Sequence, residues 1–230
     1  MSLNEISGQI PFGAPLLWEM SEADYGANNY NGWSLAQPVR VRRLDPSLCL
    51  VSLHAVNHYR NGAIKPADIC TGGLVRMLGA VAGVSTIINQ SCEPAMEPQP
   101  YQYTPAELAL ERMLFKNPSL VVFDFHGAKD NDQFDIALGT GGPNMSRAQE
   151  RLTGLIADEC ARAGLRCALN PEGYKGDKPS SLTRRAREML ELHSIVQIEI
   201  SRRLRQPTAE SAAPLLQMLG SVISRLRLTL

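Results

Sequence analysis

Two of the four histidines in the chain stand where apolar runs end, and these runs predict buried strands. His54 follows the run 48–53, and His126 lies in the stretch Phe123-Asp124-Phe125-His126-Gly127 after the run 120–123. Ligands of α/β sheets bind just beyond the carboxyl ends of the strands. We therefore expect both imidazoles at the edge of the sheet where chemistry takes place.

Imidazole and carboxylate are ligands of borderline divalent metals such as Zn²⁺, and a catalytic zinc has three protein ligands and one open position. The loop after His54 offers one acid, so that the candidate ligand set is His54, Asp68 and His126. Asp124 or Asp135 would orient an imidazole by accepting its second N–H. The alternative is that both histidines are hydrogen-bonded structural residues, which is the commoner role of a histidine at a strand end.

A third histidine, His58, lies four residues after His54. In a helix the two would share a face, as paired zinc ligands do. The strand pattern before His54 and the turn-favouring Asn57 and Asn61-Gly62 argue against a helix. We expect His58 to face substrate or solvent, and an enzyme site centred on His58 stays an alternative.

Glu199 lies in an otherwise apolar run, 195–200, which predicts a late strand. Gln197 shares its face through the strand period of two. A partly desolvated glutamate is an effective general base for water that a metal activates, because the metal lowers the pKa of the water to about 7. The competing interpretation is that Gln197 and Glu199 line a solvated face.

The stretch Thr140-Gly141-Gly142 precedes a helix that Ser146 caps, and backbone N–H groups there could bind an anion. A simple turn is the default interpretation, because the GxGxxG spacing and a P-loop lysine are missing. The chain also has no GxSxG elbow, so nucleophilic serine catalysis has little support.

The elements that must position these residues follow from periodicity and caps. Apolar runs predict strands near residues 39–43, 48–53, 84–89, 120–126, 134–138, 165–169 and 194–200, and amphipathic patterns predict helices near 71–83, 104–116, 146–163, 182–192 and 208–228. Residues 57–68 and 91–104 are expected to be loops. Strands that alternate with helices without a linker predict one α/β domain over 1–230, with residues 1–37 as an irregular arm packed on it.

Composition limits the class of protein. Lys+Arg and Asp+Glu both number 23, so the chain has no excess of basic residues that would indicate a nucleic-acid partner. Five scattered cysteines without CxxC form neither a disulfide framework nor a thiolate zinc site, and they favour a cytoplasmic location. Residues 1–10 lack a signal-peptide pattern, and no apolar run approaches the ~20 residues of a membrane span, so we expect no membrane partner. The oligomeric state is not predicted.

Four segments in order resemble those of the N-formylglutamate amidohydrolase family, whose relatives include poly-γ-glutamate hydrolases and, remotely, zinc carboxypeptidases and aspartoacylases. They are His54 with 65–68 and 71–74, then 123–127 with 135–139, then 173–176 with 183–185, and finally 197–200 with 202–203. The resemblance begins at His54 and leaves residues 1–45 uncovered.

This resemblance implies a three-layer α/β/α fold of the phosphorylase/hydrolase-like type, with a central mixed, largely parallel sheet. It implies one Zn²⁺ per chain at His54, Asp68 and His126, with Glu199 as general base and acid. The implied substrate is a small carboxylate-bearing amide of the N-formyl-glutamate, N-acyl-glutamate or γ-glutamyl kind. The residues expected to bind this substrate are Arg184, Arg185, Arg202, Asn57 and Tyr174.

The sequence also departs from the pattern of the family. Leu53 stands where the family has proline before the histidine. Asn57 stands three residues after His54, where the remote carboxypeptidases have a glutamate ligand, so the carboxylate must come from Asp68. The alternative to an enzyme is a catalytically inactive fold relative that acts as a binding or scaffold protein.

Overall fold

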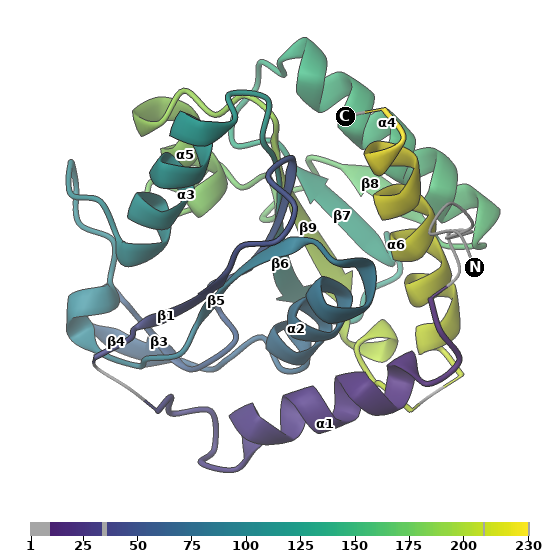
Figure 1. Cartoon of the computed structure of the whole chain (residues 1–230), viewed down its shortest axis with the longest axis horizontal. Coiled ribbons are helices and arrows are strands. Elements are labelled where there is room, and N and C mark those ends of the chain that lie inside the picture. Colours follow the sequence, from purple (N-terminus) through teal and green to yellow (C-terminus); the bar gives the residue numbers. More distant parts are fainter. Residues whose placement is uncertain (1–9, 34–35, 209, 230) are drawn as a thin grey trace.

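The computed structural model, which describes residues 10–33, 36–208 and 210–229, has a seven-stranded sheet at its centre (Figure 1). The strand order is β1-β5-β2-β6-β9-β7-β8. β1 pairs antiparallel with β5 and β7 pairs antiparallel with β9, while the other neighbours are parallel. The predicted mixed, largely parallel sheet is therefore confirmed.

The strands lie where the apolar runs predict them. Their bounds are β1 (Val39–Arg42), β2 (Leu48–Ser52), β5 (Ser85–Asn89), β6 (Val121–Ala128), β7 (Ile136–Gly139), β8 (Cys167–Leu169) and β9 (Ile195–Ser201). The expected loop 57–68 instead contains a separate hairpin of β3 (His58–Arg60) and β4 (Ala63–Lys65). Asn61 and Gly62 connect these two strands, and both have a positive φ, which suits a two-residue hairpin turn.

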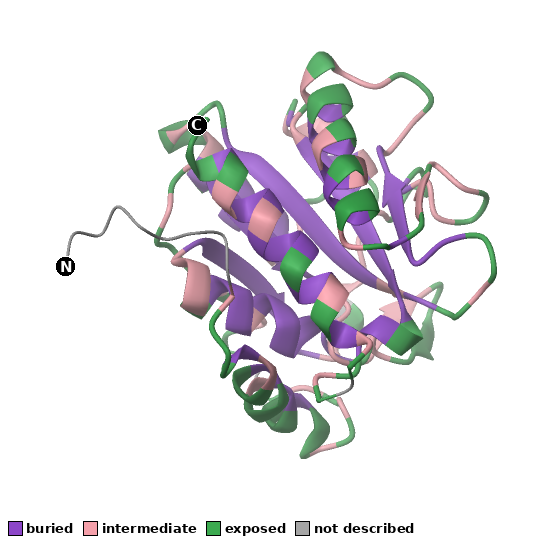
Figure 2. Ribbon diagram, turned by 90° about the vertical axis from the view of Figure 1, so that its right-hand side faces the viewer, coloured by how far each residue is buried: buried purple, intermediate pink, exposed green. Residues whose placement is uncertain are grey.

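Helices cover both faces of the sheet, as predicted. They are α1 (Ala14–Gly26), α2 (Thr71–Ala82), α3 (Pro105–Lys116), α4 (Arg147–Arg162), α5 (Leu182–Met189) and α6 (Ala212–Arg227), with short 3₁₀ turns η1 (Pro94–Met96) and η2 (Arg202–Leu204). α3 and α5 pack on one face, and α2, α4 and α6 on the other. Figure 2 shows the sheet buried almost throughout, with exposed residues on the outer sides of the helices. No helix in the described ranges is long and apolar enough to cross a membrane.

The two faces of the sheet separate by strand periodicity. In β6, Phe123 and Phe125 face the core under α2, α4 and α6, whereas Val122 faces the core under α3 and α5. By the strand period of two, Asp124 and His126 lie on the same face as Val122, the face under α3 and α5. The face under α3 and α5 therefore changes from apolar to polar towards the carboxyl end of β6, which is where a site can form.

The arm expected to be irregular contains the thirteen-residue helix α1. Its buried residues include Trp18, Glu22 and Tyr25. Leu16 and Leu17 are exposed. The prediction was wrong because an acid lies in this buried stripe and apolar residues lie on the exposed side, so the sequence shows little hydrophobic periodicity. Residues 1–9 of the arm lie outside the described residues.

A buried ion pair joins α5 to α3. Nε and Nη2 of Arg185 lie 2.5 and 2.9 Å from the two carboxylate oxygens of Glu107. Glu107 also accepts a hydrogen bond from the backbone N–H of Thr104 in a capping box at the start of α3. Arg185, one of the three predicted substrate arginines, is thus held in the structural core between these helices.

Replacing Arg185 by Met is expected to lower the free energy of unfolding by about 3–5 kcal/mol, because the Glu107 carboxylate stays buried without its cation. The control is Arg184→Met, which removes a partly exposed pair with Glu188 and an exposed hydrogen bond to the carbonyl of Asp177, and it is expected to cost less than about 1 kcal/mol. Urea unfolding measures both changes. Losses of equal size would contradict the structural role of Arg185.

Candidate metal centre

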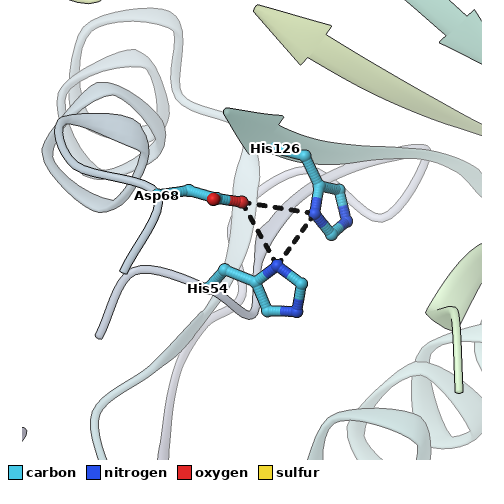
Figure 3. Close-up of side chains that lie close together, drawn as sticks. All are labelled: His54, Asp68 and His126. Atoms are coloured by element: carbon cyan, nitrogen blue, oxygen red, sulfur yellow. Dashed lines mark hydrogen bonds and ion pairs between the residues drawn. The ribbon is translucent and has the colours of Figure 1, made fainter. Parts of the chain in front are cut away.

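Three separate segments bring the predicted ligands together (Figure 3). His54 follows β2, Asp68 lies just before α2, and His126 is in β6. His54 Nδ1 is 3.0 Å from His126 Nδ1 and 3.2 Å from Asp68 Oδ2. His126 Nδ1 is 3.4 Å from the same carboxylate oxygen. One nitrogen from each ring and one oxygen thus point at a common centre.

These separations fit a small tetrahedral cation. With metal–ligand bonds of about 2.0–2.1 Å, the ligand atoms of a tetrahedral zinc lie about 3.3 Å apart. Two imidazoles and one carboxylate also supply the donor set of an open, catalytic type of zinc site. The two Nδ1 atoms lie within hydrogen-bond distance of each other, and a cation between them would take one lone pair from each ring.

The charges of two candidate ligands also suit a metal. Burial, followed by the proximity of His126, lowers the pKa of His54, so this ring is neutral and has a free lone pair. Burial raises the pKa of Asp68, but hydrogen bonds with His126 and His54 lower it more, so the carboxylate stays ionised. Metal ligands must be in these deprotonated forms.

Asp124 lies beneath the second nitrogen of His126. Its Oδ2 is 3.2 Å from His126 Nε2 and accepts the hydroxyl of Thr183 at 3.2 Å, and its side chain is fully buried. Burial lowers the pKa of His126, yet Asp124, Asp68 and Glu199 together hold it well above its usual value. The raised pKa keeps this ring protonated in the metal-free protein, so a metal would have to displace the hydrogen on Nδ1, while Asp124 favours keeping the hydrogen on Nε2.

Glu199 is directly beside His126, because the parallel register of β6 and β9 pairs the two residues. Glu199 is only 8% exposed, so the strand face that it shares with Gln197 is buried rather than solvated. Burial raises the pKa of Glu199 to about 7. Gln197 Nε2 donates to Glu199 Oε1 at 2.9 Å, which fixes the orientation of the carboxyl group.

These groups open into one cavity of about 260 Å³. His54, Asp68, His126 and Glu199 line it together with His58, Arg60, Tyr174 and Lys178. The ring of His58 stacks on that of His54, with centroids 3.8 Å apart and planes 2° from parallel. His58 thus faces the cavity from the hairpin, in the position expected of a substrate-facing histidine.

Of the predicted substrate residues, Tyr174 and Arg185 line the cavity, although the guanidinium of Arg185 is bound by Glu107. Three others lie outside it. Arg184 pairs with Glu188, Arg202 is exposed in η2, and Asn57 bonds to the backbone of Asn29 and Ala67.

Two further sequence interpretations change in the structure. The carboxylate of Asp135 accepts from Arg166 at 2.8 Å and from Arg203 at 2.6 Å, and among the described residues it contacts no imidazole. Asp124 alone therefore orients a candidate ligand. In the glycine stretch, the N–H of Gly141 donates to the carbonyl of Lys175, which agrees with a turn rather than an anion site.

Sequence reasoning missed Arg205, a buried arginine with no motif around it. Its guanidinium donates to the carbonyls of Ile69, Ala128 and Ile200. A Cβ on Gly127 would lie 2.6 Å from the Cζ atom of Arg205, so this guanidinium explains why glycine follows His126. That glycine was the one local signal of a group packed against the strand.

No family model and no curated protein matches the sequence, but solved structures do. N-formylglutamate amidohydrolase from Ralstonia eutropha JMP134 aligns with a TM-score of 0.56 and 16% identity over 84% of this chain and 99% of that chain. A bacteriophage poly-γ-glutamate hydrolase aligns with a TM-score of 0.50 and 17% identity over 83% of this chain and 88% of that one.

A third similar structure is gene product Atu2144 from Agrobacterium tumefaciens, with a TM-score of 0.53 and 12% identity over 84% of this chain and 94% of that chain. This chain has the fold of these proteins. The resemblance expected from four short segments is therefore confirmed at the level of the fold. Identities this low carry no activity across, and any function must be argued from the site.

Asp124→Asn is expected to weaken zinc binding by about 10- to 100-fold. An amide N–H facing Nε2 would favour the tautomer with its hydrogen on Nδ1, the nitrogen that points at the metal position. Asp135→Asn is the matched control and should leave the affinity unchanged. Competition with a chromophoric chelator measures both, and equal losses would show that Asp124 has no special role.

Proposed function

We propose that this protein is a zinc-dependent hydrolase of a linear amide bond near a carboxylate, of the N-formyl-glutamate, N-acyl-glutamate or γ-glutamyl type. The observation that carries the proposal is the meeting of His54 Nδ1, His126 Nδ1 and Asp68 Oδ2 in a cavity beside the buried Glu199. The fold shared with an N-formylglutamate amidohydrolase and a poly-γ-glutamate hydrolase supports the choice of bond.

His54, Asp68 and His126 would hold one Zn²⁺ per chain and leave its fourth position open to the cavity. When bound, the ion supplies a Lewis acid that polarises the amide carbonyl and lowers the pKa of water to about 7. Asp124 keeps the His126 ring oriented throughout.

Glu199 carries the proton. Its pKa of about 7 lets it accept and return a proton near neutral pH. It takes a proton from the attacking water, whose oxygen bonds to the amide carbon. The C–N bond then breaks, and Glu199 returns the proton to the leaving nitrogen, so the products are a carboxylic acid and an amine. Gln197 holds one oxygen of Glu199 and leaves the other free for this transfer.

Arg60 is the best candidate for the substrate carboxylate. Arg60 and Lys178 line the cavity, and neither has an acidic partner among the described residues. Arg60 Nη2 is 3.3 Å from His58 Nε2, which places the guanidinium beside the histidine that stacks on His54. A planar guanidinium binds a carboxylate with two parallel hydrogen bonds, which a lysine cannot do. We therefore assign the role expected of Arg184, Arg185 or Arg202 to Arg60.

The test of the activity is hydrolysis of N-formyl-, N-acetyl- and γ-glutamyl substrates by protein purified without chelator. We expect about one zinc per chain and activity that a chelator removes and added zinc restores. Glu199→Gln should lower kcat by a factor of about 100 to 10,000 with the zinc still bound, because only the proton carrier is lost.

His126→Ala serves as the companion variant, and it should lose both zinc and activity. Purified wild-type protein without metal and without hydrolysis of any of these substrates would instead support a binding or scaffold protein.

Arg60→Ala is expected to raise KM about 10- to 100-fold for a substrate with a free carboxylate, since a hydrogen bond to a charged group contributes about 1.5–3 kcal/mol. The KM for the same substrate with its carboxylate converted to an amide should change little. Lys178→Ala is the matched control, because Lys178 lines the same cavity from the loop before α5. A larger rise for Lys178→Ala than for Arg60→Ala would move the assignment to the lysine.

A further inference from the structure

The segment that carries Asp68 is held from behind by α1. Glu22 of this helix, only 7% exposed, accepts the backbone N–H of Cys70 at 2.6 Å and that of Gly73 at 2.8 Å. Trp18 Nε1 donates to the carbonyl of Cys70 at 2.8 Å. One acid and one indole thus bind the backbone at the start of α2, within a few residues of Asp68.

The backbone that they bind has an unusual conformation. Cys70 has φ 71°, a left-handed value that a non-glycine residue keeps only where its surroundings hold it. This turn connects Asp68 to the first residue of α2, and the N–H of Thr71 donates to the carbonyl of Asp68. The position of the Asp68 carboxylate therefore depends on the contacts that keep Cys70 in this conformation.

The contact between α1 and the start of α2 is tight. A Cβ on Gly73 would lie 2.6 Å from Glu22 Oε2, and a Cβ on Gly72 would lie 3.0 Å from the Cε2 atom of Tyr25 in α1. A helix that only covered the core would do so with apolar side chains, because a buried carboxylate is costly unless it is hydrogen-bonded. Here the carboxyl group lies opposite the N-terminal end of α2; burial raises the pKa of Glu22, and the hydrogen bonds from the N–H groups of Cys70 and Gly73 oppose that rise.

We propose that Glu22, together with Trp18, is a positioning group of the metal centre: α1 fixes the backbone that carries Asp68, and metal affinity depends on it. The inference rests on the proposed metal site. It assigns a role to a part of the chain that the family resemblance leaves uncovered. The competing role for Glu22 is general stability of the packing of α1 on the domain.

The chain provides a matched control two residues away. Asp24 lies on the same helix and forms an ion pair with Arg76 of α2, with 61% of the Asp24 side chain exposed. Asp24→Asn loosens the same helix pair at the surface without touching the backbone of residues 68–73. Glu22→Gln has the same shape as the native residue, but its amide has only one oxygen for two N–H donors and faces the other with an NH₂ group.

The experiment compares wild type, Glu22→Gln and Asp24→Asn in the full chain by zinc competition, by the visible spectrum after Co²⁺ loading, and by hydrogen exchange of the metal-free protein. For Glu22→Gln we expect zinc affinity to fall about tenfold or more. We also expect a changed cobalt spectrum, and faster exchange at the amides of Cys70 and Gly73. Asp24→Asn should match wild type in all three.

Each outcome has one meaning. The inference is overturned if Glu22→Gln has the zinc affinity and the cobalt spectrum of wild type. It is also overturned if Asp24→Asn loses as much zinc affinity as Glu22→Gln, because the effect would then come from the packing of α1 on α2 in general. Wild-type protein that binds no metal overturns the proposed function itself and this role with it. If Glu22→Gln does not fold, Trp18→Phe replaces it, because it keeps the ring in the core and removes only the N–H that binds Cys70.

Discussion

One buried guanidinium, that of Arg205, joins the three segments that carry two of the candidate metal ligands, Asp68 and His126, and the candidate base Glu199. Arg205 donates to the carbonyls of Ile69, Ala128 and Ile200, which follow Asp68, His126 and Glu199 by one or two residues. A buried guanidinium is tolerated because its N–H groups are satisfied by these carbonyls. Arg205 therefore acts together with the pairing of β6 and β9 and with the contacts of α1 in fixing the relative positions of these three side chains.

The electrostatic balance of the site depends on these fixed positions. Asp68, Asp124 and Glu199 all act on His126 and raise its pKa, and burial together with the two aspartates raises the pKa of Glu199. Carboxylates crowded in a buried place need a positive charge nearby. A divalent cation at the common centre of His54, Asp68 and His126 would provide it while leaving Glu199 as the group that exchanges a proton. The same crowding that is costly without a cation thus favours binding of one.

The sequence predicted what depends on local pattern and missed what depends on distant pairing. Strands followed from apolar runs, and the helix starts at Thr104 and Ser146 followed from capping residues that the structure shows as capping boxes. Two of the three candidate ligands came from histidines at strand ends, and Asp68 came from the loop after the first of them. The pairing of Arg185 with Glu107 did not follow from the sequence because the two residues are far apart in the chain, and no spacing rule indicates that they pair. α1 was missed for a related reason, because its buried acid is explained only by its hydrogen bonds to the backbone at the start of α2.

Asn57, three residues after His54, connects the N-terminal arm to the loop that carries Asp68. Its side chain bonds to neighbouring segments and lies outside the cavity. Its Nδ2 donates to the carbonyl of Asn29 at 3.1 Å, and its Oδ1 accepts the N–H of Ala67, the residue before Asp68. Its own N–H donates to the carbonyl of Tyr30. Asn57 therefore links the N-terminal arm to the residue before Asp68, and α1 makes a second link to the backbone after Asp68 through Glu22.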